Sequence, residues 1–248
     1  MSEPILSIKN LHMKYGSNEV LKGIDLEIKN GEIVILMGAS GSGKSTLLRC
    51  INHLEKTTEG TMTICGRTIN LHKWKKDDIA FTRNNTSMVF QNYNLFLHKT
   101  ALENVMEGLT QVKRIPKNEA YEIACHYLEK TGMLEFKDHY PSMMSGGQQQ
   151  RVGIARSLAM RPQIIMFDEP TAALDPELVG EILNLMKQVA KEGITMIVVT
   201  HQVSFARDVA DTIAILDKGV ISDIGDAESI INNPDNPNTR RFLNLLDY

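Results

Sequence analysis

One short stretch of this sequence has the clearest chemistry. Residues 38–45 read GASGSGKS and fit the phosphate-loop pattern G-x-x-x-x-G-K-[S/T] at every fixed position. Its glycines let backbone N–H groups close around a phosphate chain, and the helix expected after it adds partial positive charge. Lys44 supplies a full charge for the β- and γ-phosphates, and the Ser45 hydroxyl is a hard oxygen ligand suited to Mg²⁺. We therefore expect nucleoside triphosphate binding by Gly38, Ala39, Ser40, Gly41, Ser42, Gly43, Lys44, Ser45 and Thr46.

Two adjacent acids are a second chemical feature. Asp168 and Glu169 follow the apolar run at 163–167. Burying charge at the end of an apolar strand is costly, so paired carboxylates there need a reason. With a phosphate loop upstream, Asp168 fits an acid that holds Mg²⁺ through water. Glu169 is then placed to orient or deprotonate a water that attacks the γ-phosphate. Solvated acids at an exposed strand end are the alternative.

A further group of backbone donors lies at Ser145-Gly146-Gly147-Gln148, just before a helical pattern at 151–160. Backbone N–H groups at a positive helix end form an anion site. One chain needs only one phosphate loop for one nucleotide. This second element therefore suggests a cap over a nucleotide held by a partner; the alternative is a glycine-containing helix entry with no ligand.

The elements that must position these residues indicate an α/β framework. Short apolar runs at 33–37, 163–167 and 194–200 are typical of buried parallel strands, and helical spacing follows Thr46 and Asp175. We expect Asp175 to be the N-cap residue of its helix. Residues 24–28 alternate apolar and charged, as in a half-exposed antiparallel strand.

Residues 92–142 carry apolar residues at helical spacing with no strand between them, so we expect a helical subdomain inserted into the α/β core. Residues 67–83 are polar and locally basic around Trp74. Asp77 and Asp78 interrupt that charge, which favours a solvated insertion or surface helix over a nucleic-acid patch.

Composition bounds the function classes. Of 248 residues, 42% are hydrophobic and 23% are charged, and the net charge of −3 argues against a nucleic-acid partner. Cys50, Cys65 and Cys125 are scattered, which indicates free thiols in a reducing compartment. We expect neither a signal peptide nor a membrane span, since no segment approaches roughly 18 apolar residues. If the protein works at a membrane, other chains must cross it.

Taken together, these motifs resemble those of the ATP-binding subunits of ABC transporters. Ser145-Gly146-Gly147-Gln148 matches that family's signature motif, residues 38–46 its Walker A motif and residues 164–169 its Walker B motif. Other positions match the Q-loop, the D-loop, the switch histidine and the adenine-stacking aromatic with its neighbour; these are Gln91, Ala173-Leu174-Asp175, His201, Tyr15 and Val20. Met144 and Gln202 depart from the usual leucine and glutamate.

The resemblance covers nearly the whole chain and implies a fold. That fold is a RecA-like P-loop NTPase core with an antiparallel β subdomain and an inserted α-helical subdomain. We expect one ABC domain over residues 1–248. Within it, residues 1–91 and 151–248 form the core with its β layer, and residues 92–150 form the helical subdomain.

The resemblance also implies a mechanism. Two copies sandwich two ATP molecules with Mg²⁺, and each nucleotide contacts the phosphate loop of one chain and the signature residues and Asp175 of the other. Glu169, His201 and Gln91 are the expected catalytic residues, and Ser45, Gln91 and Asp168 the expected metal ligands. Permease subunits and, through them, a solute-binding protein are the expected partners, at the cytoplasmic face of the cell membrane.

Within the family, several segments resemble importers of polar amino acids, closest to the cystine and glutamine types. They are residues 21–24, 90–96, 102–105, 204–207 and 239–243. Three alternatives remain open: an importer ATPase for another small solute, an ABC ATPase that acts on DNA or ribosomes, and a regulatory cassette that binds ATP without hydrolysing it. Length and charge weigh against the second, and the presence of Glu169 and His201 against the third.

Overall fold

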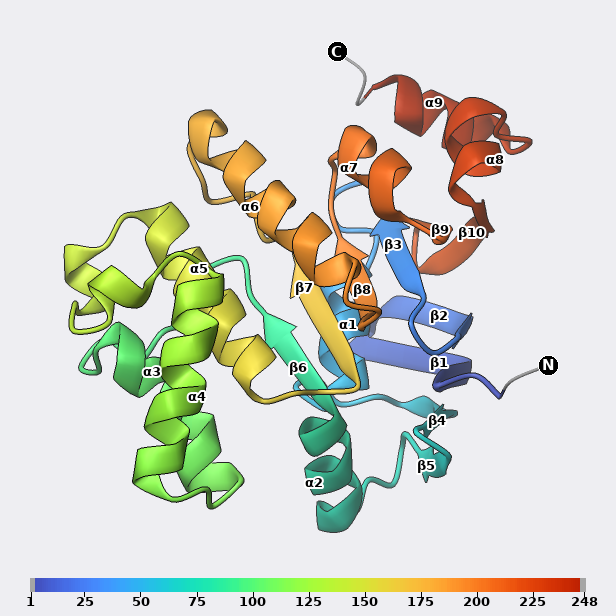
Figure 1. The fold of residues 1–248 in the computed structure, drawn as a ribbon. Helices are drawn as coiled ribbons and strands as arrows, with labels where there is room; N and C mark the ends of the chain where they lie inside the picture. Colours follow the sequence, from blue (N-terminus) through green and yellow to red (C-terminus); the bar gives the residue numbers. More distant parts are fainter. Residues whose placement is uncertain (1–2, 246–248) are drawn as a thin grey trace.

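The computed structural model describes residues 3–245 and contains two β-sheets, with most of the helices beside the larger one (Figure 1). The ends of the expected domain, residues 1–2 and 246–248, lie outside the described residues. The strands are β1 (Leu6–Tyr15), β2 (Asn18–Ile28), β3 (Ile33–Met37), β4 (Glu59–Ile64), β5 (Arg67–Asn70), β6 (Thr86–Val89), β7 (Ile164–Asp168), β8 (Thr195–Val199), β9 (Thr212–Asp217) and β10 (Val220–Asp226).

The helices alternate with the strands of the larger sheet. They are α1 (Lys44–Ile51), α2 (Lys76–Asn85), α3 (Ala101–Glu107), α4 (Lys117–Lys130), α5 (Gly146–Ala159), α6 (Pro176–Ala190), α7 (Val203–Val209), α8 (Ala227–Asn232) and α9 (Pro237–Asn244). A π-helical turn, Gly108–Val112, follows α3 directly.

The larger sheet has six strands in the order β10-β9-β3-β8-β7-β6. All neighbouring pairs are parallel except β9 and β10. Every residue of β3, β7 and β8 is buried, because both faces of these strands are covered. The expected RecA-like α/β core is therefore confirmed.

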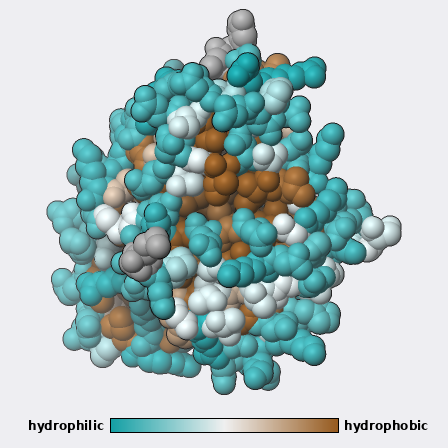
Figure 2. All heavy atoms as spheres, turned by 90° about the vertical axis from the view of Figure 1, so that its right-hand side faces the viewer, coloured by the Kyte–Doolittle hydropathy of each residue, from teal (hydrophilic) through white to brown (hydrophobic). Residues whose placement is uncertain are grey.

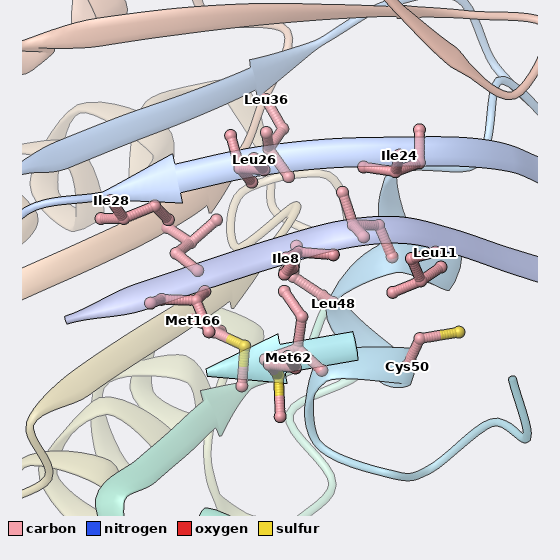
Figure 3. Packing of buried hydrophobic residues seen from close by; sticks show 14 of the residues in the cluster. Ile8, Leu11, Ile24, Leu26, Ile28, Leu36, Leu48, Cys50, Met62 and Met166 are labelled. Carbon is pink, nitrogen blue, oxygen red and sulfur yellow. The ribbon is translucent and has the colours of Figure 1, made fainter. Parts of the chain in front are cut away.

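The smaller sheet is antiparallel, in the order β2-β1-β4-β5. It supplies one side of a core whose other side comes from α1 and the larger sheet (Figure 3). Leucine, isoleucine and methionine side chains from both sheets meet there, including Ile8, Leu26, Leu36 and Met166. The opposite face of the larger sheet packs against α5, α6 and α7 in a second core.

Helices α3, α4 and α5 form a unit at one side of the molecule, away from the antiparallel sheet (Figure 1). This unit has a hydrophobic cluster of its own, which includes Val105, Leu128 and Val152. Helix α5 starts at Gly146, earlier than the helical pattern indicated, and runs unbroken to Ala159. A subdomain limit at residue 150 therefore falls inside one continuous helix, and the division into subdomains stays a prediction.

Residues 67–83 contain strand β5 and the start of α2. Trp74 is partly buried there and stacks on His53 with ring centroids 4.4 Å apart. Figure 2 shows the face with the antiparallel sheet as mostly hydrophilic, with one hydrophobic area near its middle. In residues 3–245, no helix is long and apolar enough to cross a membrane.

Candidate active site

The chemically important residues lie where neighbouring parallel strands end. The carboxyl ends of β3, β8, β7 and β6 lead into Gly38, His201, Glu169 and Gln91 respectively. In open α/β sheets, ligands bind at this edge because the strand ends and helix starts leave polar groups there. The strand order thus brings together residues that are far apart in the sequence.

The phosphate loop depends on glycine at two positions in particular. Gly38 has φ of 144°, and a Cβ there would lie 2.1 Å from the carbonyl oxygen of Leu216. Gly43 has φ of 111°, and a Cβ there would lie 2.8 Å from the Leu21 side chain. Both conformations exclude larger residues. The loop then leads into α1, whose first bond runs from the Leu47 N–H to the Gly43 carbonyl at 2.9 Å.

Two buried donors in this loop lack an anionic acceptor. The Lys44 side chain is 4% exposed and donates to the carbonyls of Gly38 at 2.8 Å and Ala39 at 3.0 Å. Burial lowers the pKa of its ammonium group, although the charges of Glu169 and Asp168 oppose this shift. The buried Ser42 hydroxyl has no hydrogen-bond partner among the described residues. A buried cation and an unsatisfied donor in a glycine loop fit a phosphate chain.

Asp168, at the end of β7, is nearly fully buried beside the start of α1. Its carboxylate accepts a hydrogen bond from Ser45 Oγ at 2.5 Å and faces Arg49 Nη2 at 3.7 Å. Burial raises the pKa of Asp168, and the Ser45 bond and the Arg49 charge oppose that effect. A carboxylate and a hydroxyl side by side are hard oxygen ligands of the kind Mg²⁺ takes.

Glu169 and His201 face each other at the ends of β7 and β8. His201 Nε2 lies 3.3 Å from Glu169 Oε1, and this hydrogen bond lowers the pKa of Glu169 although burial opposes it. Glu169 also has φ of 46°, a strained conformation for a residue other than glycine. Such strain is frequent at functional sites, where the surrounding structure holds it in place. The pair places an imidazole beside the Glu169 carboxylate.

A cavity of about 360 Å³ lies beside these groups. It is lined by Val20, Ser40, Gly41, Gly43, Lys44, Ser45, Thr46, Gln91 and Glu169. Tyr15 is close to Thr46 and 47% exposed; burial and the neighbouring Glu55 raise the pKa of its hydroxyl. The structure therefore gathers phosphate-loop residues, Val20, Gln91 and Glu169 around one cavity, with Asp168 attached to it through Ser45.

The signature residues do not line this cavity. Ser145 begins α5 in a capping box: its Oγ accepts from the Gln148 N–H, and the Gln148 side chain accepts from the Ser145 N–H. Gly146 and Gly147 pack against Leu174 and Leu178 of the following loop and helix. The donors at this helix start therefore lie outside the cavity of the chain's own phosphate loop.

The expected helix after Asp175 is confirmed as α6, which begins at Pro176. Asp175 occupies the N-cap position, but its side chain makes no hydrogen bond to the helix. Its carboxylate lies near Tyr93 instead, and its charge adds to the effect of burial in raising the pKa of the Tyr93 hydroxyl.

Sequence reasoning missed three residues beside the site. Arg49 is four residues after Ser45, so helical spacing alone could have placed both on one face of α1. Tyr93 and Arg156 act on the loop after Gln91, where Arg156 donates to the carbonyls of Tyr93 and Asn94. No local pattern indicated that contact.

Among residues 3–245, no group of three or more His, Cys, Asp or Glu side chains is arranged to hold a metal. Ser45, Asp168 and Gln91 could supply oxygens for Mg²⁺, with phosphates and water completing the shell. This donor set fits because Mg²⁺ keeps several waters and usually takes only one or two carboxylates.

Comparisons with known proteins agree with this geometry. The family model described as ABC transporter matches residues 21–172. The L-cystine import ATP-binding protein TcyN of Bacillus subtilis is 49% identical over 96% of this chain and 92% of its own length. The histidine/lysine/arginine/ornithine transport ATP-binding protein HisP of Escherichia coli is 50% identical over 98% of both chains. The dimeric post-hydrolysis structure of the ATP-binding cassette MJ0796 with ADP and Pi has a TM-score of 0.79 at 38% identity, over 90% of this chain and 98% of that one. With a phosphate loop, an acid pair and a histidine assembled on the same fold, this chain belongs to the ABC transporter family.

Proposed function

We propose that this chain is the ATP-binding and ATP-hydrolysing subunit of an importer of polar amino acids. One observation carries the proposal: Lys44, the Ser45–Asp168 pair and the Glu169–His201 pair converge at the carboxyl edge of one sheet. Full-length relatives named for cystine and for basic amino acid transport support the choice of solute class.

The chain's own residues divide the work. The phosphate loop holds the triphosphate through its N–H groups and Lys44, with Val20 and Tyr15 beside the adenine. Ser45, Asp168 and Gln91 hold Mg²⁺, which would neutralise phosphate charge when bound. Glu169 accepts the proton of the attacking water, while His201 holds the Glu169 carboxylate and the water in line with the γ-phosphate.

The position of the signature residues supports a homodimer. Ser145, Gly146, Gly147 and Gln148 lie outside the cavity formed by their own chain. A two-fold partner brings each signature loop and Asp175 onto the other chain's nucleotide, so that each copy supplies what the other lacks. The dimeric form of the MJ0796 cassette supports this arrangement.

We infer that permease subunits bind this dimer at the cytoplasmic face of the membrane. A solute-binding protein acts through them, and no nucleic acid takes part. Phe96 and Leu97, on the loop that follows Gln91, are 48% and 69% exposed. Exposed apolar side chains on a loop next to the nucleotide suit a contact that transmits ATP binding to another chain.

Uptake measurements test the solute. Deletion of the gene should impair uptake of one or a few polar amino acids in a labelled panel, with cystine and glutamine as the first candidates. Complementation with the wild-type gene should restore uptake, and the Glu169→Gln variant should not. Unchanged amino acid uptake together with a defect for a metal, sugar or lipid would refute this part of the proposal.

Size exclusion tests the dimer. Glu169→Gln keeps the side-chain volume but removes the base and a negative charge beside the phosphates, so this variant should elute as a dimer with ATP and as a monomer with ADP. Adding Ser145→Arg should abolish that dimer while each monomer still binds ATP. Ser142→Arg is the matched control, because Ser142 is also exposed and lies just before the signature motif. If the protein with Ser145→Arg still dimerises, the proposed role of the signature loop is wrong.

A further inference from the structure

Tyr93 lies where three loops of the chain meet. Its hydroxyl donates to the carbonyl of Ala173, in the loop before α6, at 3.0 Å. A Cβ placed on Gly146, at the start of α5, would lie 2.5 Å from the same hydroxyl oxygen. Tyr93 itself follows Gln91, which lines the nucleotide cavity, by two residues. One phenol therefore touches the loops that contain Gln91, the signature motif and Asp175.

The backbone at Tyr93 is held in an unusual conformation. Tyr93 and Asn94 have φ of 59° and 48°, in the left-handed region that few residues other than glycine adopt. Arg156 of α5 stabilises this turn by donating to the carbonyl of Asn94 at 2.8 Å and to that of Tyr93 at 3.1 Å. Arg156 is half-buried, and the loss of solvent around its guanidinium lowers its pKa to about 10. Such a turn persists only where its surroundings enforce it.

The two loops that Tyr93 touches also touch each other. A Cβ on Gly146 would lie 3.4 Å from the Leu174 side chain, and one on Gly147 would lie 3.1 Å from Leu178. Apolar contacts of this kind leave room for sliding, whereas the hydrogen bond from Tyr93 to a backbone carbonyl has a defined direction. The phenol therefore sets the register between the signature loop and the loop of Ala173.

We propose that Tyr93 is a positioning residue that fixes the signature loop and the Asp175 loop relative to Gln91 of the same chain. This inference rests on the proposed function, since those two loops act on the nucleotide held by the partner. Tyr93 does not line the cavity of its own phosphate loop. Its hydroxyl aligns the surface that the partner's ATP must meet.

The Tyr93→Phe variant tests the role with little risk to folding, because the ring stays. ATP affinity of the monomer should stay within about twofold of wild type, since the phosphate loop is untouched. The kcat should fall about three- to tenfold, the scale of one lost hydrogen bond, while KM changes little. In the Glu169→Gln background, half-maximal ATP-dependent dimerisation should need about three- to tenfold more protein. Tyr140→Phe is the matched control, because Tyr140 is exposed and forms no side-chain hydrogen bond among the described residues.

A suppressor experiment tests the contact directly. Gly146→Ala alone places a methyl group 2.5 Å from the Tyr93 hydroxyl, but the next ring atom, Cζ, is 3.4 Å away, which is ordinary contact. In the Glu169→Gln background, the Gly146→Ala variant should therefore dimerise poorly. Adding Tyr93→Phe to it should lower the protein concentration needed for half-maximal dimerisation by at least threefold. If Tyr93 had only a structural role, Tyr93→Phe would instead lower the melting temperature, and kcat would not fall selectively while KM stayed the same.

The outcomes separate the two proposals. If the wild-type protein neither hydrolyses ATP nor dimerises, the proposed function fails and this inference falls with it. If the wild-type protein is active and Tyr93→Phe matches it in kcat and dimerisation, only the inference is overturned. The inference would also be overturned if the double variant dimerised worse than either single variant, by the product of the two separate losses.

Discussion

Binding and hydrolysis should separate cleanly between Lys44 and His201. The Lys44 ammonium is buried and donates to two carbonyls of its own loop, which leaves one N–H and the charge for phosphate. A charge-assisted hydrogen bond from Lys44 to a phosphate oxygen should contribute about 1.5–3 kcal/mol to binding. This lies below the Coulomb energy of two unit charges ~3 Å apart at an effective dielectric constant of ~20, which is about 5 kcal/mol. Lys44→Ala should therefore weaken ATP binding about 10- to 150-fold, at about 1.4 kcal/mol per factor of ten.

His201→Ala should behave differently. The His201 side chain is 36% exposed and contacts Glu169, but it does not line the cavity of the phosphate loop. ATP affinity should therefore change less than about threefold. The kcat should fall about a hundredfold, because the lost contact matters mainly when the water is aligned; this corresponds to about 2.7 kcal/mol of transition-state stabilisation.

Isothermal titration with ATP and Mg²⁺ gives the affinities, and phosphate release at saturating ATP gives kcat. Lys73→Ala is the control for loss of one exposed lysine elsewhere. Equal loss of affinity in Lys44→Ala and His201→Ala would refute the division of roles. So would a His201→Ala variant that keeps its kcat.

Three further outcomes follow from local geometry. Gly38→Ala places a Cβ 2.1 Å from a carbonyl oxygen and should lower the free energy of unfolding in urea by about 3–5 kcal/mol. Gly180→Ala, exposed in α6 with nothing within 4 Å, should raise it by about 0.5–1 kcal/mol. Similar effects of both variants would contradict the steric argument. Burial raises the pKa of Cys50 from 9.0 to about 12, so the unfolded chain loses this proton first and stability should fall as pH rises from about 9 to about 12, by at most about 4 kcal/mol. The Cys50→Ala variant should show a shallower loss in urea unfolding at pH 8 and pH 10.5, and identical slopes would exclude a contribution from this thiol. Ser45→Ala should raise the Mg²⁺ concentration needed for half-maximal ATP binding about tenfold, while Ser45→Thr keeps the hydroxyl and should not; an unchanged Mg²⁺ requirement would remove Ser45 from the metal ligands.

Local patterns in the sequence were enough to predict the individual elements of the site. The phosphate loop depends on glycines at fixed spacing, and the structure shows positive φ at Gly38 and Gly43, where a Cβ would collide with its surroundings. The Ser145–Gln148 stretch was likewise predicted to lie at the entry to a helix, and the structure places it at the start of α5. Both signals lie within a few residues of the groups they organise.

Boundaries and some contacts were not predictable in this way. The helical pattern began at residue 151, but α5 starts at Gly146, because a serine cap lets glycines enter the first turn. Asp175 has the residue type of a helix cap, yet its carboxylate lies near Tyr93 instead. For Asp175, a neighbour distant in sequence decided between locally acceptable conformations.

Only the tertiary structure decided which residues meet. Ser45 and Asp168 are 123 positions apart, and their hydrogen bond exists because β7 and β3 both pair with β8. Backbone hydrogen bonds between strands carry little information about partner choice, so strand order comes from packing of the whole core. The sequence by itself therefore determined which chemical groups the protein has and the local form of its loops. The order of the sheet determined that Lys44, Asp168, Glu169 and His201 share one edge, and that Tyr93 joins the loops around it.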